Sequence, residues 1–91
     1  MSQHEDQIIR QLRALVGTAS VSSTDPSWDQ GNRGVVELLA SWLGDLGFRT
    51  EITDVSPDGH KANLVATLGS GPGGLVLAGH SDTVPFDAAL W

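Results

Sequence analysis

A continuous apolar run that ends at a histidine and an aspartate constrains the fold more than any other stretch of this chain. The run lies in residues 74–87, which read GLVLAGHSDTVPFD, and its apolar part is residues 75–78. A run of this length bounded by glycines predicts a strand that is buried on both faces of a sheet. His80 and Asp82 follow its carboxyl end, which is the edge of an open α/β sheet where ligands bind.

The two-residue spacing of His80 and Asp82 suits a metal ligand with a supporting carboxylate. Alternate side chains of an extended chain point the same way, so these two share one face and Ser81 points away from both. The divergence of neighbouring side chains also excludes a catalytic triad made of these three residues. A neutral imidazole binds a divalent cation through one ring nitrogen, while a carboxylate on the other nitrogen orients the ring. The alternative is a structural histidine at a strand end, with Asp82 capping a turn.

The segment LVLAGH, followed by an aspartate two residues on and by Thr-Val-Pro, resembles the first metal-ligand segment of the M20 family of zinc-dependent deacylases and peptidases. Residues 29–48, DQGNRGVVELLASWLGDLGF, resemble the same family, so the similarity extends over about residues 8–91. The extension VPFD at residues 84–87 is typical of the branch of this family that acts on N-acetylornithine. By this resemblance His80 is a metal ligand, and Asp82 is its supporting, catalytic partner.

The resemblance implies an α/β fold, namely the amino-terminal part of a zinc-exopeptidase-like catalytic domain with two helices and about three strands in a mixed sheet. It also implies a metal-dependent amide hydrolase that removes the acetyl group from N-acetylornithine, a step of arginine biosynthesis. The implied cofactor is a pair of zinc ions, with cobalt as the alternative metal. The implied partner is a small N-acyl amino acid, and the complete enzyme is expected to be a homodimer.

The other metal ligands and the general base of the family all lie downstream of residue 91. Residues 1–91 are therefore expected to be the amino-terminal portion of one truncated catalytic domain, inactive alone. Two alternatives remain. One is another M20 deacylase or peptidase, such as an acetylcitrulline deacetylase or a succinyl-diaminopimelate desuccinylase, and the other is a non-catalytic truncated module.

Composition excludes several classes of protein. A chain of 91 residues allows one small domain. The absence of cysteine excludes a disulfide framework and a thiolate zinc site. A net charge of −6 opposes binding to nucleic acid or to an anionic membrane. The polar amino terminus and the lack of a long apolar run argue against a signal peptide and a membrane span, so we expect a cytoplasmic location.

Two helices are predicted in the first half of the chain. Residues 5–16 carry apolar side chains at helical spacing, which predicts an amphipathic helix that packs on a sheet face. Residues 35–46 have the strongest helical pattern and predict a core helix, with Gly47 as a left-handed cap and Phe48 folding back on the last turn. Ser27 and Gln30 have capping-box spacing, so the second helix is expected to begin near residues 27–32, although Gly31 and Gly34 also allow a later start.

The intervening and following segments are predicted to be loops and a hairpin. Residues 48–53 alternate in polarity and residues 63–68 form a second strand, with a turn at residues 56–59 between them. His60 is assigned to that turn, and the serines at 20, 22 and 23 to turns and caps, since no nucleophile elbow surrounds them. Residues 69–74, GSGPGG, lack the lysine and the following helix of a phosphate loop, so they are a flexible connection.

The predicted central strand needs more neighbours than this chain supplies. A strand buried on both faces requires strands on both edges and helices on both faces. We therefore expect a bare edge, with Phe86, Leu90 and Trp91 substantially exposed.

Overall fold

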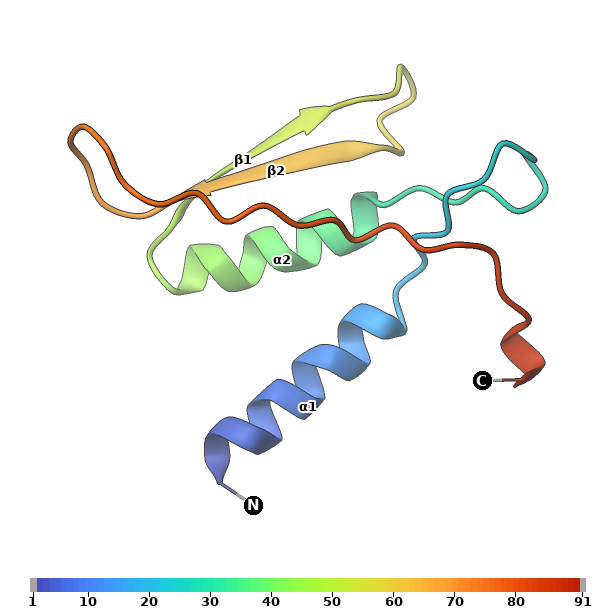
Figure 1. The fold of residues 1–91 in the computed structure, drawn as a ribbon, viewed down its shortest axis with the longest axis horizontal. Helices are drawn as coiled ribbons and strands as arrows, with labels where there is room; N and C mark the ends of the chain where they lie inside the picture. The colour runs from blue at the N-terminus through green and yellow to red at the C-terminus, as the bar shows by residue number, and fades with distance from the viewer. Residues whose placement is uncertain (1, 91) are drawn as a thin grey trace.

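The computed structural model describes residues 2–90 as two helices, one antiparallel hairpin and connecting segments (Figure 1). The elements in chain order are α1 (Gln3–Val16), α2 (Arg33–Asp45), β1 (Arg49–Asp54), β2 (Ala62–Thr67) and a short 3₁₀ helix, η1 (Ala88–Leu90). The radius of gyration is 15.2 Å, whereas about 12 Å is typical of a compact domain of this length. The chain is therefore more spread out than a complete small domain.

Helix α1 forms where the sequence predicts it, but it buries none of its residues. Its first turn is capped by Ser2, whose hydroxyl accepts a hydrogen bond from the Glu5 N–H at 3.2 Å. Ile8 and Leu12, on its apolar stripe, remain 54% and 53% exposed. The helix extends away from the hairpin (Figure 1). The prediction that it packs on a sheet face is wrong, because α2 occupies the hairpin face that the structure provides.

Helix α2 begins later than the predicted capping box. Asn32 is its N-cap residue and makes no side-chain capping bond. Ser27 instead bonds Asp25, and the Gln30 side chain accepts a hydrogen bond from the Val21 N–H at 2.9 Å. The capping-box prediction is wrong because both of its side chains have other partners.

The carboxyl end of α2 agrees with the predicted left-handed cap. Gly47 has a φ of +96°, a region that favours glycine. Its N–H donates to the Gly44 carbonyl at 3.0 Å, and the Phe48 N–H donates to the Leu43 carbonyl at 3.0 Å. These two bonds define a Schellman motif, which turns the chain directly into β1.

Strands β1 and β2 form the predicted antiparallel hairpin. Ile52 lies opposite Leu64, and Arg49 lies opposite Thr67 at the open end. The turn between the strands is held by the Asp58 carboxylate, which accepts hydrogen bonds from the Ser56 hydroxyl and the His60 N–H. These bonds lower the pKa of Asp58 below its ordinary value.

The core is small and lies where α2 and β2 begin. Val35 and Val36 on α2 and Ala62 on β2 are each at most 4% exposed. The Asn32 side chain joins the two elements, since its Oδ1 accepts from the Ala62 N–H at 2.8 Å and its Nδ2 donates to the Ala62 carbonyl at 2.9 Å. Burying one valine side chain contributes about 1.5–3 kcal/mol. Each buried valine therefore contributes a substantial part of the stability of a unit this small.

Residues 75–78 do not form the predicted central strand. Leu75, Val76 and Leu77 are 84%, 88% and 87% exposed, and the segment is not paired with either strand. The sheet has two antiparallel strands, not about three in a mixed arrangement. A strand buried on both faces needs partners on its edges and layers on both sides. Within residues 2–90 the two strands pair with each other, so the α/β class is confirmed and the strand count is corrected.

The carboxyl-terminal residues are exposed, as predicted. Leu90 is 81% exposed and Phe86 is 48% exposed. The prediction for Trp91 lies outside the described residues. None of the helices in residues 2–90 has the length and apolar character needed to cross a membrane.

Candidate functional site

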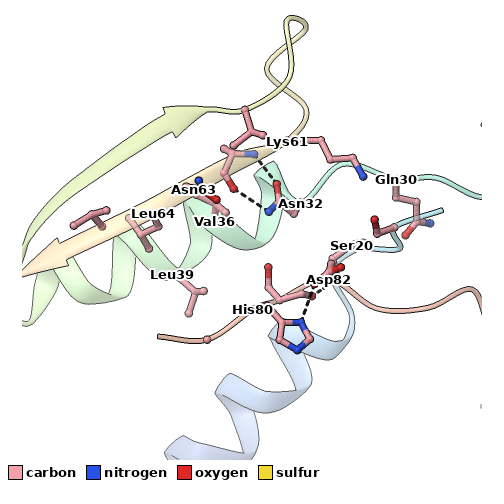
Figure 2. A pocket seen from close by; sticks show the side chains of 16 residues that line it. Ser20, Gln30, Asn32, Val36, Leu39, Lys61, Asn63, Leu64, His80 and Asp82 are labelled. Carbon is pink, nitrogen blue, oxygen red and sulfur yellow. Dashed lines mark hydrogen bonds and ion pairs between the residues drawn. The ribbon is translucent and has the colours of Figure 1, made fainter. Parts of the chain in front are cut away.

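His80 and Asp82 lie side by side in the segment that follows the apolar run (Figure 2). The distance from His80 Nδ1 to Asp82 Oδ1 is 2.8 Å, which is a hydrogen bond. The contact predicted from their two-residue spacing is therefore confirmed. The prediction that the pair follows the end of a strand is wrong, because residues 75–78 are not a strand.

This contact determines which ring nitrogen of His80 remains available. An ionised carboxylate has only acceptor sites, so the neutral imidazole must carry its proton on Nδ1 and donate it to Asp82. Nε2 then keeps its lone pair. The His80 side chain is 84% exposed, so Nε2 can be reached by a ligand. Chemically, the pair can bind a divalent cation through Nε2 or accept a proton there.

An open pocket of about 710 Å³ lies between this segment and the α2–β2 unit (Figure 2). The volume falls within the range of roughly 300–1,000 Å³ that is typical of small-molecule sites. Its wall is polar on the side of the loop before α2, apolar along α2, and mixed along β2. Figure 2 labels Gln30 and Asn32 on the loop before α2, Val36 and Leu39 on α2, Lys61 in the turn before β2, and Asn63 and Leu64 on β2.

Lys61 is the cationic side chain in the wall of this pocket. Its Nζ lies 2.8 Å from Asp29 Oδ1, so the charge is paired across the pocket rim. The Lys61 hydrogen bond, with a further bond from the Ser23 N–H, lowers the pKa of Asp29 below its ordinary value. Asp29 is therefore ionised at neutral pH and holds Lys61 in place.

The loop after α1 holds the segment that carries His80 and Asp82. The Ser20 hydroxyl donates to the Ser81 carbonyl at 2.9 Å. The Thr83 N–H donates to the Ser20 carbonyl at 3.1 Å, and the Ser22 N–H donates to the Thr83 carbonyl at 2.8 Å. Val21 and Thr83 form an isolated parallel bridge. The sequence analysis missed Ser20, because a contact across 61 residues leaves no local signal.

His60 lies apart from the pocket wall, as its assignment to the turn predicts. Its carbonyl accepts a hydrogen bond from the Arg33 N–H at 3.1 Å, and its side chain is exposed. Within residues 2–90, no three His, Asp or Glu side chains come together in a group that could hold a metal ion. His80, with its free Nε2, has the donor chemistry of a single zinc ligand.

Comparison with known proteins matches the chain to deacetylases, a class of hydrolase. The matched proteins are acetylornithine deacetylases. The chain is 61% identical over 77 residues to the protein from Vibrio campbellii, and 58% identical over 77 residues to that from Vibrio cholerae. It is 52% identical over 83 residues to the protein from Pasteurella multocida. No protein-family model matches the chain.

These alignments cover most of this chain but a small part of each relative. They include 85% of the chain for the two Vibrio proteins and 91% for the Pasteurella protein. The chain spans 20% of the length of the Vibrio relatives and 22% of the Pasteurella relative. The resemblance to the acetylornithine branch, which the sequence predicts, is thereby confirmed over about a fifth of the relatives' length.

Proposed function

We propose that this chain is the amino-terminal part of a zinc-dependent amidohydrolase that removes the acetyl group from N-acetylornithine. The observation that carries the proposal is the 2.8 Å contact between His80 and Asp82, which leaves His80 Nε2 free for a metal. The pair lies in a chain that is 52–61% identical to acetylornithine deacetylases over most of its length.

His80 and Asp82 have different roles in this proposal. His80 Nε2 contributes one zinc ligand, and Asp82 holds the ring in the tautomer that exposes Nε2. A bound zinc site supplies a nucleophilic water at neutral pH and polarises the amide carbonyl of the substrate. The remaining ligands and the general base are contributed from outside residues 2–90.

The pocket beside His80 would receive the N-acyl amino acid. Its apolar side chains on α2 and β2 can cover aliphatic atoms, while Gln30 and Asn63 contribute polar groups to the wall. A small substrate with a polar amide and charged termini needs both kinds of surface. The substrate class proposed is therefore an acetylated amino acid.

A chimera tests the proposal. The matching amino-terminal part of the Vibrio cholerae acetylornithine deacetylase is replaced by this chain, and hydrolysis of N-acetylornithine is measured with and without zinc. We expect zinc-dependent hydrolysis that exceeds the rates with N-acetylcitrulline and N-succinyl-diaminopimelate. His80→Ala should reduce kcat/KM by at least about a hundredfold. Asp82→Asn should reduce it by about 10–100-fold, because Asp82 acts on the metal through His80.

The turn histidine provides the matched control. His60→Ala removes an imidazole of the same chemistry outside the pocket and should leave kcat/KM of the chimera unchanged. Equal activity of the His80→Ala and His60→Ala chimeras would refute the metal-ligand role. The isolated 91-residue chain should show no turnover with added zinc or cobalt, since it offers one ligand.

A further inference from the structure

Residues 81–83 are attached to the rest of the molecule through the loop at residues 20–22. Three hydrogen bonds make this attachment: Ser20 hydroxyl to Ser81 carbonyl at 2.9 Å, Thr83 N–H to Ser20 carbonyl at 3.1 Å, and Ser22 N–H to Thr83 carbonyl at 2.8 Å. Ser20 is only 8% exposed and Val21 is 4% exposed. The loop side of the attachment is therefore buried at Ser20 and Val21, whereas Ser22 and Thr83 are exposed. Of the three bonds, the one from the Ser20 hydroxyl starts from a buried residue, where a hydrogen bond is worth more than at the surface.

The chain on the other side of His80 has no comparable attachment. Within the described part of the chain, no backbone hydrogen bond involves residues 69–80. Leu75, Val76 and Leu77 are exposed and make no core. The position of His80 therefore depends on what holds residues 81–83.

Of the three bonds, the one from Ser20 Oγ is made by a side chain. It fixes the Ser81 carbonyl, which belongs to the peptide unit that connects directly to Asp82. Asp82 lies between two bonded residues, Ser81 and Thr83, so its Cα and its side-chain direction are held. Its carboxylate in turn accepts the hydrogen bond from His80 Nδ1 at 2.8 Å.

We propose that Ser20 is a positioning residue for the His80–Asp82 pair. Its hydroxyl keeps the peptide before Asp82 in the orientation that lets the carboxylate reach the imidazole, and so keeps Nε2 as the free nitrogen. The consequence of this positioning, a metal ligand that is already oriented before the metal binds, rests on the proposed function. The positioning itself involves only Ser20, Ser81, Asp82 and His80, all of which belong to this chain.

Nuclear magnetic resonance of the 91-residue chain tests the role of Ser20 without catalysis. The ¹⁵N shifts of the His80 ring report its tautomer at a pH where the imidazole is neutral, and amide exchange of Thr83 reports the attachment. In Ser20→Ala we expect loss of the preference for protonated Nδ1, and Thr83 exchange faster by on the order of tenfold, the equivalent of one net hydrogen bond.

Ser22→Ala is the matched control. Ser22 contributes its backbone N–H to the attachment, and alanine keeps that group, so the tautomer and the Thr83 exchange rate should match those of the parent chain. The amide of Val36 in α2 donates to the Asn32 carbonyl at 3.0 Å and is buried, so it reports the packed unit and should exchange equally in all three proteins.

Two results would overturn the proposal. An unchanged His80 tautomer in Ser20→Ala would show that the hydroxyl has a structural role only. Equal acceleration of Val36 and Thr83 exchange would show general destabilisation instead of local release. Neither readout depends on deacetylation, so an inactive chimera would refute the proposed function and leave the role of Ser20 intact.

Discussion

Residues 32–67 and residues 69–90 both contain apolar runs, but only the first segment buries them. In residues 32–67, α2 lies against the hairpin, and Val35, Val36 and Ala62 are almost completely buried. In residues 69–90, the apolar run at 75–77 is more than 80% exposed. The difference shows that an apolar sequence favours burial, but that its side chains are buried only where another part of the chain packs against them.

The complementary surfaces of the first segment are close together in sequence. Helix α2 passes through the Gly47 cap into β1, and a short turn returns the chain as β2. Consecutive elements of this kind usually pack on each other, because short connections leave them adjacent. Residues 81–83 instead bond to a loop about 60 residues earlier in the chain, and the preceding apolar run has no partner among residues 2–90.

The largest expected effect comes from placing a charge in the buried core of residues 32–67, and the same substitution in residues 69–90 is the comparison. Val35→Asp should destabilise the chain by several kcal/mol, about 3–5, because an unpaired carboxylate replaces a side chain that is 3% exposed. Native domains have only about 5–15 kcal/mol of stability in total. Urea unfolding followed by circular dichroism measures the change.

Val76→Asp is the partner experiment in the second segment. Val76 is 88% exposed, so the same substitution should change the free energy of unfolding by no more than about 0.5 kcal/mol. A loss comparable to that of Val35→Asp would break the comparison, because it would mean that residues 75–78 are buried in solution.

An intermediate effect is expected from the Asn32 side chain, which joins α2 to β2. Asn32→Ala leaves the N–H and carbonyl of Ala62 without partners, and Ala62 is only 2% exposed. The expected loss is about 1–3 kcal/mol, the cost of burying unsatisfied polar groups. Asn63→Ala, on the adjacent exposed position of β2, is the control and should cost no more than about 0.5 kcal/mol. Equal losses in the two variants would show that the Asn32 bonds do not stabilise the packed unit.

The smallest effect concerns the ion pair between Asp29 and Lys61, which links the loop before α2 to the hairpin. The Lys61 hydrogen bond places the folded-state pKa of Asp29 below its ordinary value of 3.8. The pair therefore contributes stability above pH 3.8, and this contribution is lost as the pH falls through the lower folded-state pKa. Asp29→Asn should make stability less dependent on pH below the ordinary Asp29 pKa of 3.8.

Unfolding midpoints measured from pH 2 to pH 6 check this dependence. Lys61→Met should reduce the acid sensitivity in the same way, and the double variant should add little, because both substitutions remove one interaction. Additive effects of the two substitutions would show that the pair is not coupled in solution.

The predictions that hold are those made from short-range patterns. The Gly47 cap joins residues within five positions of each other, and the hairpin turn joins Ser56, Asp58 and His60 in the same way. The contact between His80 and Asp82 follows from the alternation of side chains over two residues. Such features are predictable because backbone sterics and local hydrogen bonds determine them.

The predictions that fail involve competition between partners. Ser27 and Gln30 have the spacing of a capping box, yet Gln30 bonds Val21 and the helix begins at Arg33. The stripe on α1 has the pattern of a packed helix, yet no residue of α1 is buried. The local sequence pattern limits the contacts that a side chain can make. Which of these contacts forms depends on the segments that the tertiary structure brings close to it.

The sequence by itself determined α2, the hairpin with its turn, the exposure of Phe86 and Leu90, and the contact between His80 and Asp82. Each depends on residues near one another in the chain or on the amount of apolar surface that the chain can cover. Only the tertiary structure decided that Ser20 bonds Ser81, that Asn32 bonds Ala62, and that residues 75–78 stay unpaired. These outcomes depend on which distant segments meet, since a buried strand or a buried hydroxyl exists only where another part of the chain supplies its partner.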